Sequence, residues 1–367
     1  MNKAKYAASK YKQDVESMVR QMDSMRSDKE NPIDINLSDF INKKYGGLSL
    51  EAFFDDIGID PSIDTIHNIN TLPDISVRFL MPEIIRDALK LGLRRNAIWP
   101  NLIAVEQSVP NPNVIQPWFN MSEATPKFVG EAETISVGEI SYGSKSIKLR
   151  KMGKGIKLTY ELRNYVAINL VALFMQDVGI KLGQGLDTMA ITTLINGEQV
   201  NGSESAPVIG VATPGTTSYR DLLKIWIRMA RIGRKADIIL GGEDAALETL
   251  DLPEFKERTS GTTQAKLDLK TPVPNGAAYY VHGAVPADQQ IIVDSNSTLI
   301  KYNAQPLLIE SEKTVSNQTE ATYASLTTGF GIIYRDGRVV LDQSLDVSTN
   351  GFPSYMEMDT LENVVID

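Results

Sequence analysis

The chain has 367 residues, of which 42% are apolar and 23% charged, and 37 basic against 46 acidic residues give a net charge of −9. This composition excludes a chain that is disordered throughout, and the acidic total argues against a protein whose main task is to grip nucleic acid by its phosphates. The absence of cysteine excludes disulfide scaffolds, thiol nucleophiles and cysteine-based metal sites. With His67 and His282 as the only histidines, we expect neither a metal site nor a cofactor.

The apolar stretches are short. The longest runs from Val166 to Met175 and is interrupted by Asn169, whereas a membrane-spanning helix needs about 20 apolar residues. The beginning of the sequence lacks the apolar core of a secretion signal. We therefore expect a protein that is made in the cytosol, has no membrane partner and forms two or three domains.

The first 26 residues predict an amphipathic helix, because their apolar side chains recur at steps of three and four residues. Asn31-Pro32 ends this helix, since proline lacks the amide hydrogen and disfavours a helical residue before it. Residues 32–78 alternate short apolar groups with glycine and proline and are too broken to build a core. We expect this N-terminal part to be an arm that lies on another surface.

Pro82 stands where a first helical turn tolerates proline, and a helix is predicted from Glu83 to Leu93. Residues 102–119 are predicted to be extended, with their prolines interrupting any long strand ladder.

Two extended arms, Phe128 to Tyr142 and Ser144 to Tyr160, predict a hairpin that turns around Gly143. On the return arm, Ile147 and Leu149 alternate with polar residues, which is the period of a strand. Such a hairpin has too few bulky residues to bury enough surface alone, so we expect it to project and contact another subunit. Gly153-Lys154-Gly155 lacks the spacing of a phosphate-binding loop, and a bulge is the simpler interpretation.

A long helix is predicted across Asn169 to Ile195, where an apolar stripe continues for about 40 Å. Gly179, Gly183 and Gly185 weaken it, and their expected use is to let another backbone pack close. Asn196-Gly197 ends it.

From Ser218 the pattern becomes α/β. Ser218 and Asp221 predict a capping box at the start of a helix that ends at Gly233. Further elements are predicted as a strand at Ala236–Leu240, a helix at Glu243–Leu250, and strands at Tyr279–His282, Gln290–Val293 and Thr298–Tyr302. The dipeptide Asp336-Gly337, between the β-rich runs Tyr323–Tyr334 and Arg338–Asp342, predicts a two-residue hairpin.

Charge is segregated along the chain. Residues 140–160 contain six cations and no acid, whereas the residues from Val339 to the end contain six acids and neither lysine nor arginine. Opposite-sign surfaces of this kind indicate that copies of the chain meet each other, although the solvated faces of a monomer would give the same pattern.

Five stretches, in this order and spacing, resemble the major capsid proteins of tailed bacteriophages with the Hong Kong 97 type fold. The resemblance covers about residues 75–345. The stretches are Phe128-Val129-Gly130-Glu131-Ala132-Glu133, Ser146–Thr159 leading into Tyr160-Glu161-Leu162, Asp187–Gly197, Ile238–Leu250 and Leu326–Leu341.

The resemblance implies an α+β fold of the Hong Kong 97 type with an N-terminal arm, an extended β-hairpin loop, a peripheral domain with a long spine helix, and an axial domain. The implied boundaries are 1–119 for the arm and extension, 120–159 for the loop, 160–217 with 305–345 for the peripheral domain, 218–304 for the axial domain, and 346–367 for an acidic C-terminal tail.

The resemblance also implies a function. The chain would be a major capsid protein, not an enzyme, that self-assembles into hexamers and pentamers and forms the icosahedral head around phage double-stranded DNA. Portal, scaffolding and decoration proteins would be partners, and DNA would be enclosed without specific contacts. The expected location is the virion, with the host cytoplasm during assembly. The expected contacts between subunits are at Glu131, Glu133, Lys145, Lys148, Arg150, Lys151, Lys154 and Lys157.

Alternatives remain. The same fold could form an encapsulin-like compartment that holds a cargo enzyme. A soluble α/β enzyme could use acids such as Glu131, Glu133 and Asp187, but an exposed arm offers no apolar pocket that would raise a carboxyl pKa. Some members of that capsid family crosslink a lysine of the loop to an asparagine of a neighbouring subunit. The sequence around Lys145, Lys148 and Asn350 does not match that pattern closely, so we assign these residues no crosslinking role.

Overall fold

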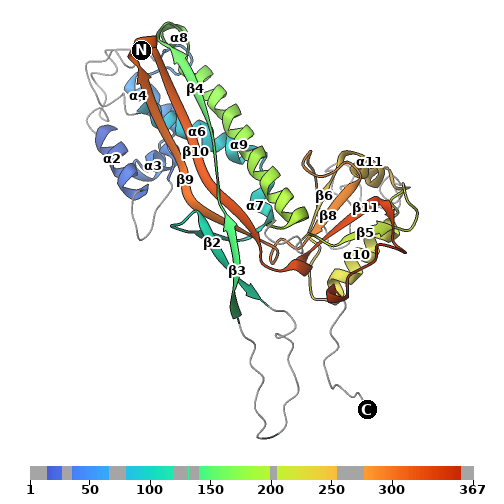
Figure 1. Ribbon diagram of the computed structural model, residues 1–367. Coiled ribbons are helices and arrows are strands. Elements are labelled where there is room, and N and C mark those ends of the chain that lie inside the picture. The colour runs from blue at the N-terminus through green and yellow to red at the C-terminus, as the bar shows by residue number, and fades with distance from the viewer. Residues whose placement is uncertain are drawn as a thin grey trace. The chain divides into compact units, whose positions relative to one another are not determined.

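A computed structural model describes residues 15–26, 35–65, 80–119, 131, 140–198, 205–253 and 277–356 of the chain. The chain divides into two compact units (Figure 1). The first is made of Met1–Ala97, Met152–Gly185 and Leu307–Leu326, and the second of Ile98–Lys151, Leu186–Pro306 and Thr327–Asp367. Each unit is therefore assembled from segments that lie far apart in the sequence.

Helices dominate the described part of the first unit. Its helices are α2 (Val15–Arg26), α3 (Leu37–Lys44), α4 (Leu50–Ile57), α6 (Leu80–Arg95), α8 (Tyr160–Tyr165) and the first part of α9 (Ile168–Asn196). Its strands are β4 (Arg150–Thr159) from Met152 onward and parts of β9 (Leu299–Thr314) and β10 (Thr319–Ile332). The helices predicted at Glu83 to Leu93 and at Asn169 to Ile195 are confirmed. The helix predicted in the first 26 residues is confirmed over Val15–Arg26, and residues 1–14 lie outside the described residues.

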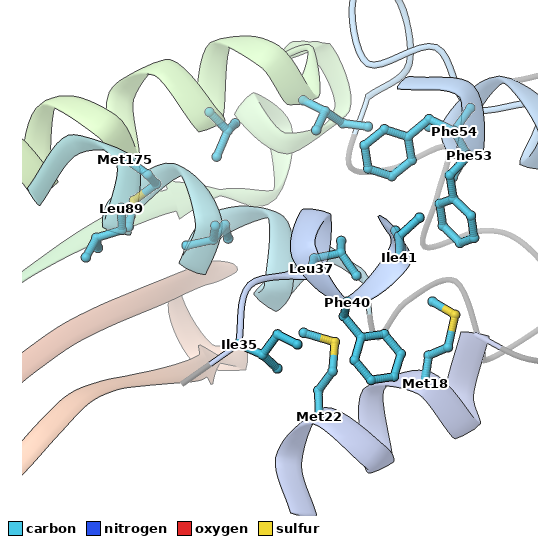
Figure 2. Packing of buried hydrophobic residues seen from close by; sticks show 14 of the residues in the cluster. Met18, Met22, Ile35, Leu37, Phe40, Ile41, Phe53, Phe54, Leu89 and Met175 are labelled. Atoms are coloured by element: carbon cyan, nitrogen blue, oxygen red, sulfur yellow. The ribbon is translucent and has the colours of Figure 1, made fainter. Parts of the chain in front are cut away.

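The N-terminal helices share one core with α6 and α9. Met18 and Met22 of α2 are fully buried and lie toward Phe40 of α3, and Phe53 of α4 belongs to the same cluster (Figure 2). Leu89 of α6 and Met175 of α9 complete it from the other side of the unit. The surface on which this N-terminal part lies is thus, for the described helices, supplied by the same chain.

Helices α6 and α9 approach each other backbone to backbone. A Cβ atom added to Gly179 would overlap the carbonyl oxygen of Leu89, and one added to Gly183 would lie 2.8 Å from the carbonyl oxygen of Leu93. Both distances are too short for real side chains. The prediction that these glycines admit another backbone is confirmed, and the partner helix is α6.

Strand β4 lies beside β10 at the edge of its sheet. Met152, Ile156 and Leu158 pack against the core that α2, α3 and α4 share. A Cβ atom on Gly155 would collide with the ring of Tyr323 on β10, so this glycine marks a close approach of two strands. Residues 152–159 belong to the first unit, within its segment Met152–Gly185.

The described part of the second unit is α/β. Its elements are α7 (Trp99–Leu102), β1 (Ile103–Ser108), β2 (Asn113–Phe119), β3 (Ile140–Lys148), the end of α9, β5 (Val208–Val211), α10 (Tyr219–Arg231), β6 (Ile238–Gly241), α11 (Glu243–Asp251), β7 (Ala278–Val281), β8 (Gln289–Val293), the remainder of β9 and β10, and β11 (Arg338–Asp346).

Five of these strands form one sheet in the order β5-β11-β8-β6-β7 (Figure 1). Helix α10 begins with the predicted capping box, in which the backbone N–H of Ser218 donates to Asp221 at 3.2 Å. Its apolar face, including Ile225 and Met229, packs with Ile239 and Ile292 of the sheet. The predicted strands and helices between residues 218 and 302 are confirmed, with boundaries shifted by a few residues except for the last strand, which continues to Thr314.

The hairpin predicted around Gly143 is wrong. Gly143 lies inside β3, and β3 pairs antiparallel with β2, from Asn113 opposite Lys148 to Phe119 opposite Ile140. The strand partner therefore comes from the segment before residue 120. The predicted outgoing arm falls largely outside the described residues.

The hairpin predicted at Asp336-Gly337 is also wrong. Strand β10 belongs with β9 and β4, whereas β11 pairs with β5 and β8 in the five-stranded sheet. The turn is held by distant residues: Arg234 donates two hydrogen bonds of 3.1 Å to the Asp336 carboxylate, and Thr298 donates to the carbonyl of Gly337. These contacts direct the chain from one sheet into another.

Among the helices described, none combines the length and the apolar character that crossing a membrane would require. The division into arm, loop, peripheral domain, axial domain and tail stays a prediction.

Candidate interaction surface

The basic return arm forms a strand with one buried and one exposed side. Ile147 and Leu149 are 4% and 5% exposed, and they pack with Ile300 and Tyr302 of β9. The intervening side chains of Lys148 and Arg150 are exposed. The predicted period of two is confirmed here, and it places both cations on the solvent side of the strand.

The pattern of burial changes at the junction of β3 and β4. Arg150 and Lys151 are exposed in succession, and beyond them Met152 begins the set of side chains that faces the core of the first unit. Lys154 and Lys157 are exposed on β4. Because β4 is an edge strand, these lysines also discourage uncontrolled pairing of its free edge.

A surface cleft of about 320 Å³ opens beside Lys148 and Arg150. We call it the basic cleft. Its lining comes from the strand residues between Ser146 and Arg150, from the end of α9, and from Gly329 and Phe330 of β10. The lining residues are Ser146, Ile147, Lys148, Arg150, Thr188, Met189, Thr192, Thr193, Gly197, Glu198, Gly329 and Phe330. All of them belong to the second unit.

Hydrogen bonds hold two parts of the cleft wall. Thr193 donates its hydroxyl to the carbonyl of Met189 at 2.8 Å, so this hydroxyl stays on its own helix. Glu198 accepts a hydrogen bond from the backbone N–H of Ile332, which ties the end of α9 to β10. Burial, together with the negative charge of Glu198, raises the pKa of Tyr302 to about 12, so this phenol stays neutral.

The two cations of the cleft have no internal counterion within the part of the chain that the structure describes. Neither Lys148 nor Arg150 forms an ion pair with a described carboxylate, in contrast to Lys301, which lies 2.8 Å from Glu106. Thr188 and Thr192 are exposed one helical turn apart on α9. The cleft thus offers cationic groups and a hydroxyl-bearing wall, a combination suited to a partner rich in carboxylates.

The structure places the predicted contact residues differently, and Lys151 is exposed in the second unit without lining the basic cleft. Lys148 and Arg150 line the basic cleft, whereas Lys154 and Lys157 belong to the first unit and do not. Glu131 is described and exposed. Glu133 and the side chain of Lys145 lie outside the described residues.

The sequence did not point to Thr188, Thr192 or Phe330. Only the i, i+4 spacing of the two threonines on a mostly apolar helix could have drawn attention to them. The acidic end of the chain also divides in two. Asp342 is buried and accepts hydrogen bonds from Gln289 and Ser344, so it serves the fold and not a surface.

The described residues contain no group of three or more histidines and carboxylates that could hold a metal ion. No protein-family model matches the chain, and no curated protein matches it.

Solved structures do match. In the mature capsid of bacteriophage PhiM1, a chain with 11% sequence identity aligns over 67% of this chain and 87% of its own length with a TM-score of 0.50. A chain of Mycobacterium phage Che8 has 12% identity over 68% of this chain and 92% of its own, with a TM-score of 0.49. A virus-like particle from Pyrococcus furiosus has 12% identity over 71% and 98%, with a TM-score of 0.48.

The architecture is therefore an α+β capsid fold, with one long helix and long strands shared between two units. The likeness to the PhiM1 capsid chain identifies it as the Hong Kong 97 type, as the sequence predicted.

Proposed function

We propose that this chain is the major capsid protein of a tailed bacteriophage. It assembles into hexamers and pentamers that form an icosahedral head around double-stranded DNA. The observation that carries the proposal is the capsid fold shared with the PhiM1 chain. The basic cleft, with its two cations unpaired among the described residues, supports contact between copies.

The proposed subunit contacts are mechanical and individually weak. Exposed ion pairs contribute about 0–1 kcal/mol each, so a shell gains its stability by repeating them over many copies. The contacts proposed are those of Glu131, Glu133, Lys145, Lys148, Arg150, Lys151, Lys154 and Lys157. Portal and scaffolding proteins, and decoration proteins on the outer surface, are proposed as further partners. The proposed location is the virion, after assembly in the host cytoplasm.

Sedimentation and negative-stain imaging of the purified chain test the proposal. Closed particles of uniform diameter are the expected result, formed either by the chain alone or with a scaffolding protein. A chain that stays monomeric at every salt concentration and pH would refute it. Nuclease treatment followed by extraction then separates a head, which protects DNA, from a compartment, which retains a cargo protein.

A further inference from the structure

Two acidic residues near the end of the chain have the same sequence spacing as the two cations of the basic cleft. Residues 357–367 contain Glu357, Asp359, Glu362 and Asp367 and no lysine or arginine. The residue before them, Met356, is fully buried in the core of the second unit, so this acidic segment starts from a fixed point. Acids placed two residues apart on an extended chain lie on the same side, about 7 Å apart.

The cations of the cleft repeat that arrangement. Lys148 and Arg150 are also two residues apart on an extended strand, on its solvent side. Glu357 and Asp359 can therefore meet both of them in one register. A volume of about 320 Å³ admits a few residues of an extended segment and not a folded domain. The exposed hydroxyl of Thr192 can bond the backbone of such a segment.

We propose that the basic cleft binds the segment around Glu357 and Asp359 of a second copy of this chain. The inference rests on the proposed capsid function and adds to it a specific contact. The cleft and the acidic segment are different surfaces of one chain, so the contact is heterologous, and heterologous contacts close into rings when the rotation permits. Glu198 also lines the cleft, and its carboxylate accepts a hydrogen bond from the backbone N–H of Ile332.

The absence of cysteine makes crosslinking a clean test. Cysteines are introduced at Thr192 in the cleft and at Thr360 in the segment, and the assembled full-length chain is treated with a short bismaleimide. A ladder of covalent multimers on a denaturing gel is expected. The matched control joins Thr360→Cys to Leu247→Cys, an exposed position on α11 outside the cleft, and should give several-fold less multimer. Crosslinked monomer without multimers would place the segment in its own cleft and overturn the proposal.

A binding measurement tests the contact between the acidic segment and the cleft even where particles do not form. A negative result is therefore distinct from a failure of the proposed capsid function. The receptor is the full-length chain with Glu357→Lys and Asp359→Lys, whose own segment cannot compete. A fluorescent peptide of residues 356–367 should bind it with an affinity that falls as salt rises. Adding Lys148→Glu and Arg150→Glu should abolish binding, whereas Arg231→Glu and Lys235→Glu, two exposed positions outside the cleft, should leave most of it. Equal binding to both charge-reversed receptors, or none to the parent receptor, would overturn the proposal.

Discussion

In the first unit two helices touch backbone to backbone, whereas in the second unit a helix meets a sheet through large side chains. The contact of α6 with α9 depends on positions without a side chain, among them Gly179 and Gly183. The contact of α10 with its sheet depends on side chains such as Ile225 and Ile292. The two cores are therefore vulnerable to opposite changes: the first to added atoms, the second to removed ones.

Gly179→Val should give the largest effect on stability. Its Cβ would overlap the carbonyl oxygen of Leu89 and lie 2.9 Å from the backbone nitrogen of Leu93. Backbone cannot move aside as a flexible side chain can, so we expect a loss of about 4 kcal/mol or more in the free energy of unfolding. Urea denaturation of the unassembled chain, followed by circular dichroism, measures it.

Gly185→Ala is the matched control on the same helix. A Cβ there would meet only the flexible end of the Met152 side chain, at 3.4 Å. Alanine also favours a helix over glycine by about 1 kcal/mol, so stability should be unchanged or slightly higher. Equal losses in the two variants would show that the close approach of α6 and α9 does not determine the stability of this core.

Asp187→Ala should cost less, about 3 kcal/mol, because it leaves two buried donors without an acceptor. Oδ1 of Asp187 accepts from the backbone nitrogens of Ile98 and Trp99 at 2.9 and 2.7 Å, at the start of α7. Asp187→Asn keeps an oxygen in place. Burial raises the pKa of Asp187, so loss of the charge itself should cost little. The melting temperature of Asp187→Asn should therefore lie close to that of wild type and well above that of Asp187→Ala. The reverse order would contradict the capping role of Asp187.

Asp87 in the first unit caps a helix as Asp187 does in the second, and it makes the stability of the chain depend on pH. Its carboxylate accepts from the backbone nitrogens of Leu37 and Ser38 at the start of α3, where the Asn36 side chain makes no capping bond. Burial raises the pKa of Asp87 from 3.8 to about 6, against the opposing effect of these hydrogen bonds. Glu83 raises this pKa further and Lys90 lowers it.

Because the folded-state pKa lies above the unfolded value, the folded chain binds this proton more tightly. The contribution of Asp87 to the free energy of unfolding should therefore fall by about 2 kcal/mol as pH rises through this interval, and then level off. Denaturation curves of wild type and Asp87→Asn, compared between pH 4 and pH 7, isolate it. Asp39→Asn, an exposed change on α3, is the control. A wild-type curve parallel to that of Asp87→Asn would contradict the assignment.

The sequence predicted the parts of the fold that depend on neighbouring residues, and it failed where a distant segment determines the structure. The capping box at Ser218 and the end of α9 at Gly197, where φ is 66°, are local signals and were predicted. The sequence around Gly143 and Asp336 also predicted local turns, but the conformation of both segments depends on residues that are distant in the sequence. Strand β2 takes the pairing edge of β3, and Arg234 holds Asp336 across 102 residues of sequence. A local pattern cannot contain such a partner.

The candidate site shows the same limit. Lys148 and Arg150 could be identified from charge and period, because both belong to one strand. Their cleft could not, since Thr192 and Phe330 come from α9 and β10, more than 40 residues away in the sequence. Glycines at 179 and 183 predicted a close neighbour without saying that it would be α6.

The smallest effect on stability is expected for Lys148→Glu with Arg150→Glu, although its effect on assembly should be large. Both side chains are exposed, and neither has an acidic partner among the described residues, so the free energy of unfolding should change by less than about 0.5 kcal/mol. Sedimentation should nevertheless show few or no particles, because the reversed charges repel the acidic segment of the next copy. Arg231→Glu with Lys235→Glu carries the same change in net charge at exposed positions outside the cleft and should assemble better. Normal particles from the variant with Lys148→Glu and Arg150→Glu would show that this strand has no role in assembly.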